Sequence, residues 1–305
     1  MTERKARLDH RAVLLLVVCC ILWGLNQAAV KTALSEIPAL WQASLRSLGG
    51  AALVLVWSLA RGIPLFERDG TLAGGLVVGL LFAAEFACIF LGLQDTTASR
   101  MAVFLYLAPF VVALGMPRIA RSERLAWPQM AGLAIAFTGV AWAFAEGFTR
   151  PAAGPRQWLG DALGVAAAVL WGATTLTIRG SRLTGTSPEK TLLYQLVVAG
   201  IVLAAAAMAR GEVLPATLSI RVWTSLSFQI IAVSFFSFLL WFWLVRHYPA
   251  TQLSSFTLLT PMFGLLFGAM LLQEPITLRL ALALAAVSTG IYLVNRPGGQ
   301  RTRGA

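Results

Sequence analysis

Long apolar runs with almost no charged residues recur along the whole chain. Runs of roughly 18 or more apolar residues are candidates for membrane-spanning helices. Only 12% of the 305 residues are charged, whereas a soluble domain carries about 25%. A soluble fold built from such a chain would have a largely apolar exterior. Because backbone groups in lipid must be hydrogen-bonded within each segment, the sequence predicts an all-α integral membrane protein.

Ten runs are long enough to be spans, and the connections between them are short. The longest connection, at 146–158, is rich in Pro and Gly and marks the midpoint of the chain. Most Lys and Arg residues fall on the side that carries both termini, which the positive-inside rule assigns to the cytoplasm. The predicted spans are 12–31, 38–60, 71–93, 97–118, 126–145, 158–178, 189–209, 222–245, 250–272 and 276–295.

The two halves of the chain repeat each other. The Trp-Gly pair at 23–24 recurs at 171–172, and Pro109 recurs as Pro261, in the same order and at nearly constant spacing. Each half holds five predicted spans, and an odd number makes the second half enter the membrane from the opposite side. Transporters with inverted repeats place their substrate site near the midplane, where the halves meet. The predicted units are repeats at 12–145 and 158–296, with cytoplasmic tails at 1–11 and 297–305.

The repeated residues resemble the EamA branch of the drug/metabolite transporter superfamily. That family's repeat carries Trp-Gly, Asn and a basic residue in its first helix, Arg in the second, Pro in the fourth, and Glu-Arg with a late Gly around the fifth. The first half has Trp23, Gly24, Asn26, Lys31, Arg46, Pro109, Glu123, Arg124 and Gly139. The second half matches more loosely, with Trp171, Gly172, Arg179, Pro261, Glu274 and Gly290, with Thr174 in place of Asn26 and no counterpart of Arg46.

The resemblance implies ten helices and the export of small metabolites across the bacterial inner membrane. Within that branch the chain looks most similar to amino-acid exporters, including those for aromatic amino acids. An exporter of drugs or other metabolites on the same fold, and a passive channel, stay as alternatives. A fused inverted repeat favours a carrier with alternating access over a channel. The expected partners are the small-molecule substrate and the lipid bilayer, and a monomer is compatible with both repeats lying in one chain.

Two ionisable residues are predicted to lie well inside a span, Arg46 and Glu85. From the ends of their spans, both fall about 21 Å from the cytoplasmic side at 1.5 Å per residue, on consecutive antiparallel helices. Ionisable groups at this depth are costly in lipid and are candidates for function. One interpretation is a structural ion pair between them. The other is that Glu85 faces a cavity and meets a substrate ammonium or a proton.

Two polar helix faces are the predicted cavity walls. Trp23, Asn26 and Gln27 share a face in the first span, and Trp171 and Thr174 share one in the sixth. Interhelical hydrogen bonding alone would also explain such polar residues. If the faces oppose each other, their indoles form a wall suited to apolar or aromatic substrates and attractive to an ammonium.

Further candidates lie at the predicted hinges. Gly24 and Gly172 would let helix backbones approach closely. Pro109 and Pro261 each remove a backbone hydrogen bond, which frees the carbonyls of the residues four before them and predicts either a static kink or a flexing point. The polar candidates Tyr106, one turn before Pro109, and Ser237, the counterpart of Glu85, complete the predicted substrate site.

Other functions find no support in the sequence. The chain has no phosphate-binding G-x-x-x-x-G-K-[ST] motif, so it encodes no ATP-driven step. The two histidines and three cysteines have no metal-ligand spacing. No pair of membrane Asp, or Ser with a membrane His or Lys, supports an intramembrane enzyme. The net charge of +11 follows the loops and indicates topology and anionic lipid rather than nucleic acid. We therefore expect no enzymatic activity, metal or cofactor.

Overall fold

The computed structural model describes residues 9–119, 127–149, 151–248, 257 and 259–295, and these contain helices and turns but no strand. Within the described residues, seven helical stretches are long and apolar enough to cross a membrane, and three shorter apolar helices accompany them. The chain is thus a multi-pass membrane protein. The helices are α1 His10–Ala33, α2 Ala39–Ala60, α3 Leu72–Asp95, α4 Ala98–Leu105, α5 Ala108–Ile119, α6 Trp127–Thr149, α7 Gln157–Arg179, η1 Arg182–Gly185, α8 Pro188–Ala209, α9 Ile220–Phe228, η2 Gln229–Ser237, α10 Phe238–His247, α12 Leu259–Leu272 and α13 Leu278–Asn295.

Short polar side chains set where several helices begin. The Asp9 carboxylate accepts the N–H of Ala12 at 2.8 Å and caps α1. Ser187 caps α8, and Pro188 occupies the first helical position, where its missing N–H costs nothing. The bounds of α1, α2, α3, α7, α8 and α13 agree with the predicted spans to within a few residues. The start of the predicted span 250–272 lies outside the described residues.

Two predicted spans are not regular helices. The fourth breaks at Tyr106 and Leu107, so that Pro109 lies in the first turn of α5 rather than inside a helix. A first-turn proline loses no intrahelical bond, so the predicted mid-helix kink is replaced by a complete break. In the eighth span, η2 is a nine-residue π-helix between α9 and α10. Such π-helical segments are frequent at functional sites.

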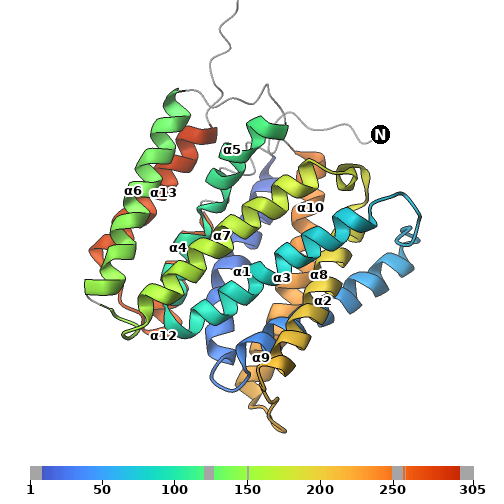
Figure 1. The fold of residues 1–305 in the computed structure, drawn as a ribbon, viewed down its shortest axis with the longest axis horizontal. Coiled ribbons are helices and arrows are strands. Elements are labelled where there is room, and N and C mark those ends of the chain that lie inside the picture. The colour runs from blue at the N-terminus through green and yellow to red at the C-terminus, as the bar shows by residue number, and fades with distance from the viewer. Residues whose placement is uncertain (1–8, 120–126, 150, 249–256, 258, 296–305) are drawn as a thin grey trace, which may run out of the picture.

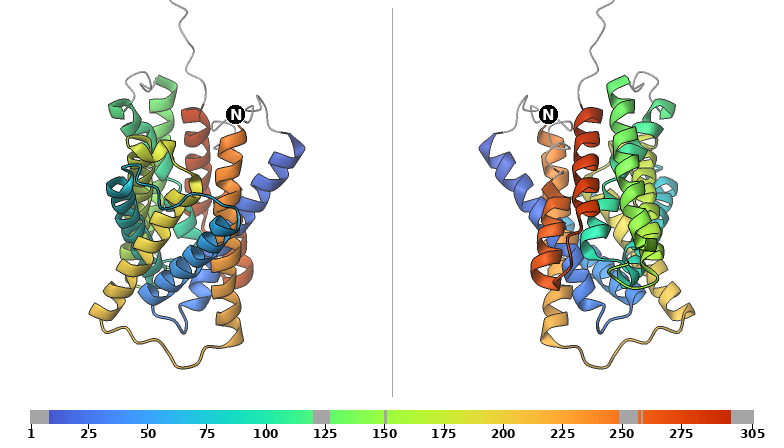
Figure 2. Two further views of the ribbon diagram at one scale, coloured as in Figure 1. Left: turned by 90° about the vertical axis from the view of Figure 1, so that its right-hand side faces the viewer. Right: turned by 90° about the vertical axis from the view of Figure 1, so that its left-hand side faces the viewer.

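The helices pack as one bundle, with α6 and α13 side by side at one end of the view in Figure 1. In the rest of the bundle, α3 packs on α7 and α8, and α2 packs on α8. The first helix α1 packs on α12, while α7 packs on α4 and α5. The long loop between α8 and α9 lies at the opposite end of the bundle from the start of α1 (Figure 2).

Candidate functional site

The π-helix η2 is the scaffold of the candidate site. It carries Gln229, Ser234 and Ser237, all fully buried, and each makes a hydrogen bond to a different polar residue of α1 or α2. Ser237 Oγ accepts the indole N–H of Trp23 at 2.9 Å. Gln229 Oε1 accepts a 3.3 Å bond from the amide of Gln42. Two residues predicted from the repeat, Trp23 and Ser237, are therefore in direct contact.

Arg46 of α2 is held from two directions and remains largely unpartnered. Its Nε donates to Ser234 Oγ at 3.1 Å. Its guanidinium lies 4.3 Å from the ring centroid of Phe86, a distance typical of cation–π stacking. The side chain is only 1% exposed, yet neither Nη1 nor Nη2 has a hydrogen-bond partner among the described residues. A buried charge with unsatisfied donors is expensive unless something else occupies its N–H groups.

Glu85 of α3 is, like Arg46, a buried ionisable residue, and it carries the opposite charge. It is buried, and its Oε2 has no hydrogen-bond partner among the residues that the structure describes. Glu85 and Arg46 are near enough for their charges to interact, but no N–O pair between them lies within the 4.0 Å of a salt bridge. The direct ion pair is therefore not formed, because the guanidinium is turned toward Ser234 and Phe86 instead.

The polar face of α1 adds two further buried acceptors. Asn26 and Gln27 are 7% and 8% exposed, and Asn26 Oδ1 and Gln27 Oε1 have no partner in the described part of the chain. The corresponding face of α7 differs. Thr174 Oγ1 donates to the carbonyl of Leu170 at 2.9 Å within its own helix. The two predicted walls are thus unequal, because the unsatisfied acceptors of this pair of faces, within the described residues, lie on α1.

Tyr106 and Trp171 form a second contact among the predicted residues. Their rings meet edge to face, with centroids 6.1 Å apart. Tyr106 is buried at the break between α4 and α5, and Trp171 packs against hydrophobic clusters on both sides of it. No ring contact or hydrogen bond within the described ranges joins this pair directly to Trp23 and Ser237.

The predicted hinge residues occupy matching positions in the two halves. A Cβ atom at Gly24 would lie 2.5 Å from the Cβ of Phe263, two residues after Pro261. A Cβ at Gly172 would lie 2.5 Å from the Cβ of Val111, two residues after Pro109. Pro261 lies in the first turn of α12, as Pro109 does in α5. The carbonyl of Thr257, which was expected to be free, accepts the N–H of Thr260.

A buried cluster of charged residues near the C-terminal end of α3 was not predicted from the sequence. Arg100, 3% exposed, donates from Nε and Nη2 to the fully buried carboxylate of Asp161 at 2.6–3.2 Å. Its Nη1 bonds Glu146 Oε2 at 3.1 Å, and Nη2 also bonds the carbonyl of Ala143. The sequence placed Arg100 and Asp161 at the ends of spans, where charge is ordinary. Only the packing of α4 against α7 shows that they are buried together.

At the same end of the bundle, Glu274, in the connection between α12 and α13, contacts the start of α4 and the end of α1. Its carboxylate accepts the N–H groups of Ala98 and Ser99 at 2.8 and 3.0 Å and so caps α4. Lys31, near the C-terminus of α1, lies 3.6 Å from Glu274 and donates to the carbonyl of Thr96. These bonds fasten the end of α1 to the α3–α4 connection. The resemblance named Lys31 and Glu274, but their pairing was not predicted.

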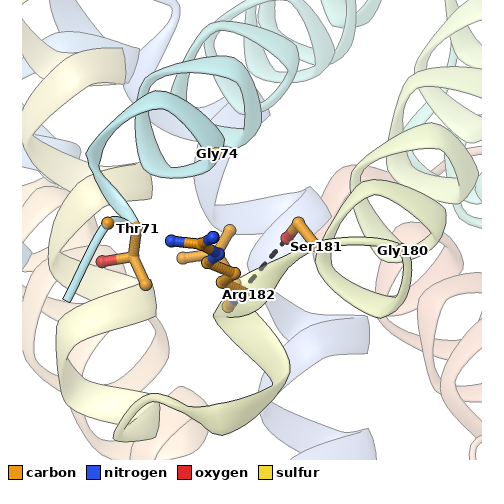
Figure 3. Close-up of a pocket in the computed structure, with 7 residues that line it drawn as sticks. Thr71, Gly74, Gly180, Ser181 and Arg182 are labelled. Carbon is orange, nitrogen blue, oxygen red and sulfur yellow. Dashed lines mark hydrogen bonds between the residues drawn. The ribbon is translucent and has the colours of Figure 1, made fainter.

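Two cavities among the described residues lie away from these groups. One, of about 470 Å³, is lined by the start of α3 and the segment after α7, with Thr71, Ser181 and Arg182 around it (Figure 3). The other, of about 430 Å³, lies between α6 and α13. Neither is lined by any residue of the predicted substrate site. The polar groups that η2 itself carries are fully buried.

Comparison with known proteins decides the family. The model of the EamA-like transporter family matches twice, at residues 10–145 and 158–296. The chain belongs to the EamA-like transporter family. In this EamA-like chain the first match ends within the last turns of α6, and the second begins at the start of α7. Glu123 and Arg124 of the family pattern lie outside the described residues.

Relatives that are named as transporters or efflux pumps match this EamA-like protein over most of their length. The transporter YvbV of Bacillus subtilis (strain 168) is 28% identical, with 93% of this chain and 92% of that one covered. A protein of Escherichia coli (strain K12) named "Probable amino-acid metabolite efflux pump" is 25% identical over 94% and 95% of the two chains. A known crystal structure shares the fold, with a TM-score of 0.65 at 18% identity, covering 94% of this chain and 96% of that one.

Proposed function

We propose that this protein is a secondary transporter that exports amino acids and related small metabolites by alternating access. The observation that carries the proposal is that Asn26, Arg46 and Glu85 are buried and have polar atoms without a hydrogen-bond partner among the described residues. A membrane protein gains nothing from burying such groups for packing alone, since each costs free energy until a partner arrives. The relative named as an amino-acid metabolite efflux pump supports the choice of substrate.

In this proposal the chain forms ten membrane-spanning helices as two inverted repeats, at 12–145 and 158–296. The supporting observation is that interhelical contacts recur when the halves are exchanged. Gly24 of α1 packs against Phe263, two residues after Pro261. Gly172 of α7 packs against Val111, two residues after Pro109. Two equivalent joints facing opposite sides would let one half open while the other closes, which is the motion that alternating access requires.

The substrate site proposed here consists of Trp23, Asn26, Glu85, Tyr106, Trp171, Thr174 and Ser237, with Gly24, Gly172, Pro109 and Pro261 at the joints. The closed end near Lys31 and Glu274 would be the outer gate. Lys31 and Glu274 hold that end shut in this state, and their separation would accompany opening to the outside. A cavity then forms between the halves when one gate opens, which agrees with the burial of the polar side chains of η2 in this state.

The experiment is counterflow in proteoliposomes that contain the purified full-length protein. Saturable exchange of labelled amino acids, competed by unlabelled amino acids, is the expected result. Flux that rises linearly without saturation would indicate a channel. Saturable exchange of other metabolites or drugs, but of no amino acid, would select the alternative substrate class.

Both termini are proposed to face the cytoplasm of a bacterial inner membrane; residues 1–8 and 296–305 lie outside the described residues. Arg68 lies in the loop between α2 and α3, and Thr217 lies in the loop between α8 and α9. Both are exposed, and the proposed topology places them on opposite sides of the membrane. In spheroplasts, an impermeant maleimide should label Thr217→Cys directly but Arg68→Cys only after permeabilisation. The reverse pattern would invert the topology.

A further inference from the structure

We propose that Arg46 and Glu85 together recognise the two charged groups of a free α-amino acid. Arg46 binds the carboxylate, and Glu85 accepts from the ammonium. This inference rests on the proposed function, because it assumes that amino acids are carried. It goes beyond that function in making Arg46, a residue otherwise interpreted as structural, a specificity-determining residue.

The first argument is a comparison between two buried arginines in the same protein. A guanidinium has five N–H donors. Arg100 is 3% exposed and has hydrogen bonds from Nε, Nη1 and Nη2 to two carboxylates and a carbonyl. Arg46 is buried more deeply, yet among the described residues its only hydrogen bond runs from Nε to the hydroxyl of Ser234. Arg100 has the contacts of a structural arginine, whereas Arg46 lacks its anion.

The second argument is the geometry that leaves Arg46 in this condition. Ser234 fixes Nε, and the ring of Phe86 covers one face of the guanidinium at 4.3 Å. Both contacts orient the planar group without using the Nη1 and Nη2 edge. An arginine edge of this kind matches a carboxylate, which it binds through two parallel hydrogen bonds. The side chain is thus preorganised for a ligand rather than merely unsatisfied.

The third argument is the position of Glu85. Its charge interacts with that of Arg46, but the two groups are not in contact. If packing had selected a structural ion pair, direct contact would offset the cost of burying both charges. A gap between two opposite buried charges instead fits a ligand that carries both complementary charges close together. An α-amino acid has its carboxylate and ammonium on the same carbon.

The surroundings of the pair suit the remainder of such a ligand. Phe82, Phe86 and Phe90 follow one another along α3 beside Arg46 and belong to the same hydrophobic cluster. Trp171 packs against that cluster. An apolar or aromatic amino-acid side chain would therefore meet a hydrophobic environment once its backbone charges are bound.

The test measures counterflow with three related probes: leucine, leucine methyl ester and N-acetyl-leucine. The ester lacks the carboxylate, and the acetylated compound lacks the ammonium. The wild-type protein should exchange leucine about 10- to 100-fold better than either derivative, as expected for one lost charge-assisted contact. In Arg46→Gln, leucine exchange should fall until leucine and the ester differ by less than about 2-fold. In Glu85→Gln, the same should hold for leucine and N-acetyl-leucine.

Arg61→Gln and Glu36→Gln are the matched controls, because Arg61 ends the same helix as Arg46 and both control residues are exposed. They should keep the wild-type discrimination. If Arg46→Gln does not assemble, Arg46→Lys is the second variant. It retains the positive charge but lacks the paired N–H donors of the guanidinium, so it should still lose most of the preference for leucine over the ester.

Three outcomes separate the possibilities. If Arg46 is only structural, its variants lower exchange of leucine and the ester equally, and the wild-type preference persists. That result would overturn the inference and leave the proposed function intact. An ester exchanged as well as leucine by the wild-type protein would also overturn it. If the wild-type protein exchanges no amino acid at all, the proposed function itself fails.

Discussion

Replacing Asp161 by Asn should be the most destabilising conservative change in the protein's charged network. Asp161 is fully buried, and it accepts hydrogen bonds from Arg100 at 2.6–3.2 Å and from Thr96 at 2.5 Å. The variant keeps the shape of the side chain but removes its charge. The guanidinium of Arg100 then stays buried with one carboxylate, that of Glu146, instead of two.

The magnitude follows from these contacts. Breaking a buried ion pair on one side costs about 3–5 kcal/mol, because the other charge is left uncompensated. Glu146 still compensates Arg100 at 3.1 Å, so the cost should lie near the lower bound, about 3 kcal/mol. A loss of this size in a large domain corresponds to a fall in Tm of roughly 6–10 °C.

The assay is thermal denaturation of the detergent-solubilised protein, followed by fluorescence-detected size-exclusion chromatography. Asp95→Asn is the matched control, because Asp95 pairs with Arg156, whose side chain is 68% exposed. An exposed pair is worth about 0–1 kcal/mol, so Tm should move by at most about 3 °C. Equal shifts for Asp161→Asn and Asp95→Asn would refute the reasoning that burial decides the worth of these pairs.

Three further predictions follow from the packing and charges. Gly24→Leu should prevent assembly or abolish exchange, because its side chain would meet α12 at 2.5 Å, whereas Gly185→Ala, with open space around it, should leave Tm unchanged. Glu274→Gln should raise the labelling rate of a cysteine at the buried position of Ala98 several-fold, by weakening the tie to Lys31; an unchanged rate contradicts the gate. The ammonium of Lys190 holds the pKa of the loop carboxyl Asp69 at about 2, so this pair contributes stability that is complete above pH 4 and is lost as the pH falls toward 2. Lys190→Met should remove that acid dependence in a pH series of Tm measurements, and an unchanged profile would show that the pair contributes nothing.

The helical spans were predictable because each depends on a local property of the chain. An apolar run of the length of a bilayer, closed by polar residues, leaves few alternatives, and α1, α2 and α8 begin and end within a few residues of the predicted bounds. The break before Pro109 and the π-helix η2 were not predictable in this way. Both depend on what neighbouring helices offer to the freed backbone groups.

The candidate site was predictable in part. Trp23, Glu85 and Ser237 were identified from the repeat and from the cost of burying polar groups, and Trp23 does bond Ser237. The charge cluster around Arg100 was missed because burial at the ends of spans depends on packing between distant segments. Its members come from α4, α6 and α7, and no local pattern joins them.

The central claim is that the buried polar groups beside η2 bind a substrate that crosses the membrane with the alternating gates. The most direct test is leucine counterflow in proteoliposomes, comparing the wild-type protein with Glu85→Gln at equal reconstituted amounts. The account predicts saturable exchange by the wild-type protein and a loss of at least about 10-fold in the variant. Saturable exchange that is the same in both proteins would contradict it.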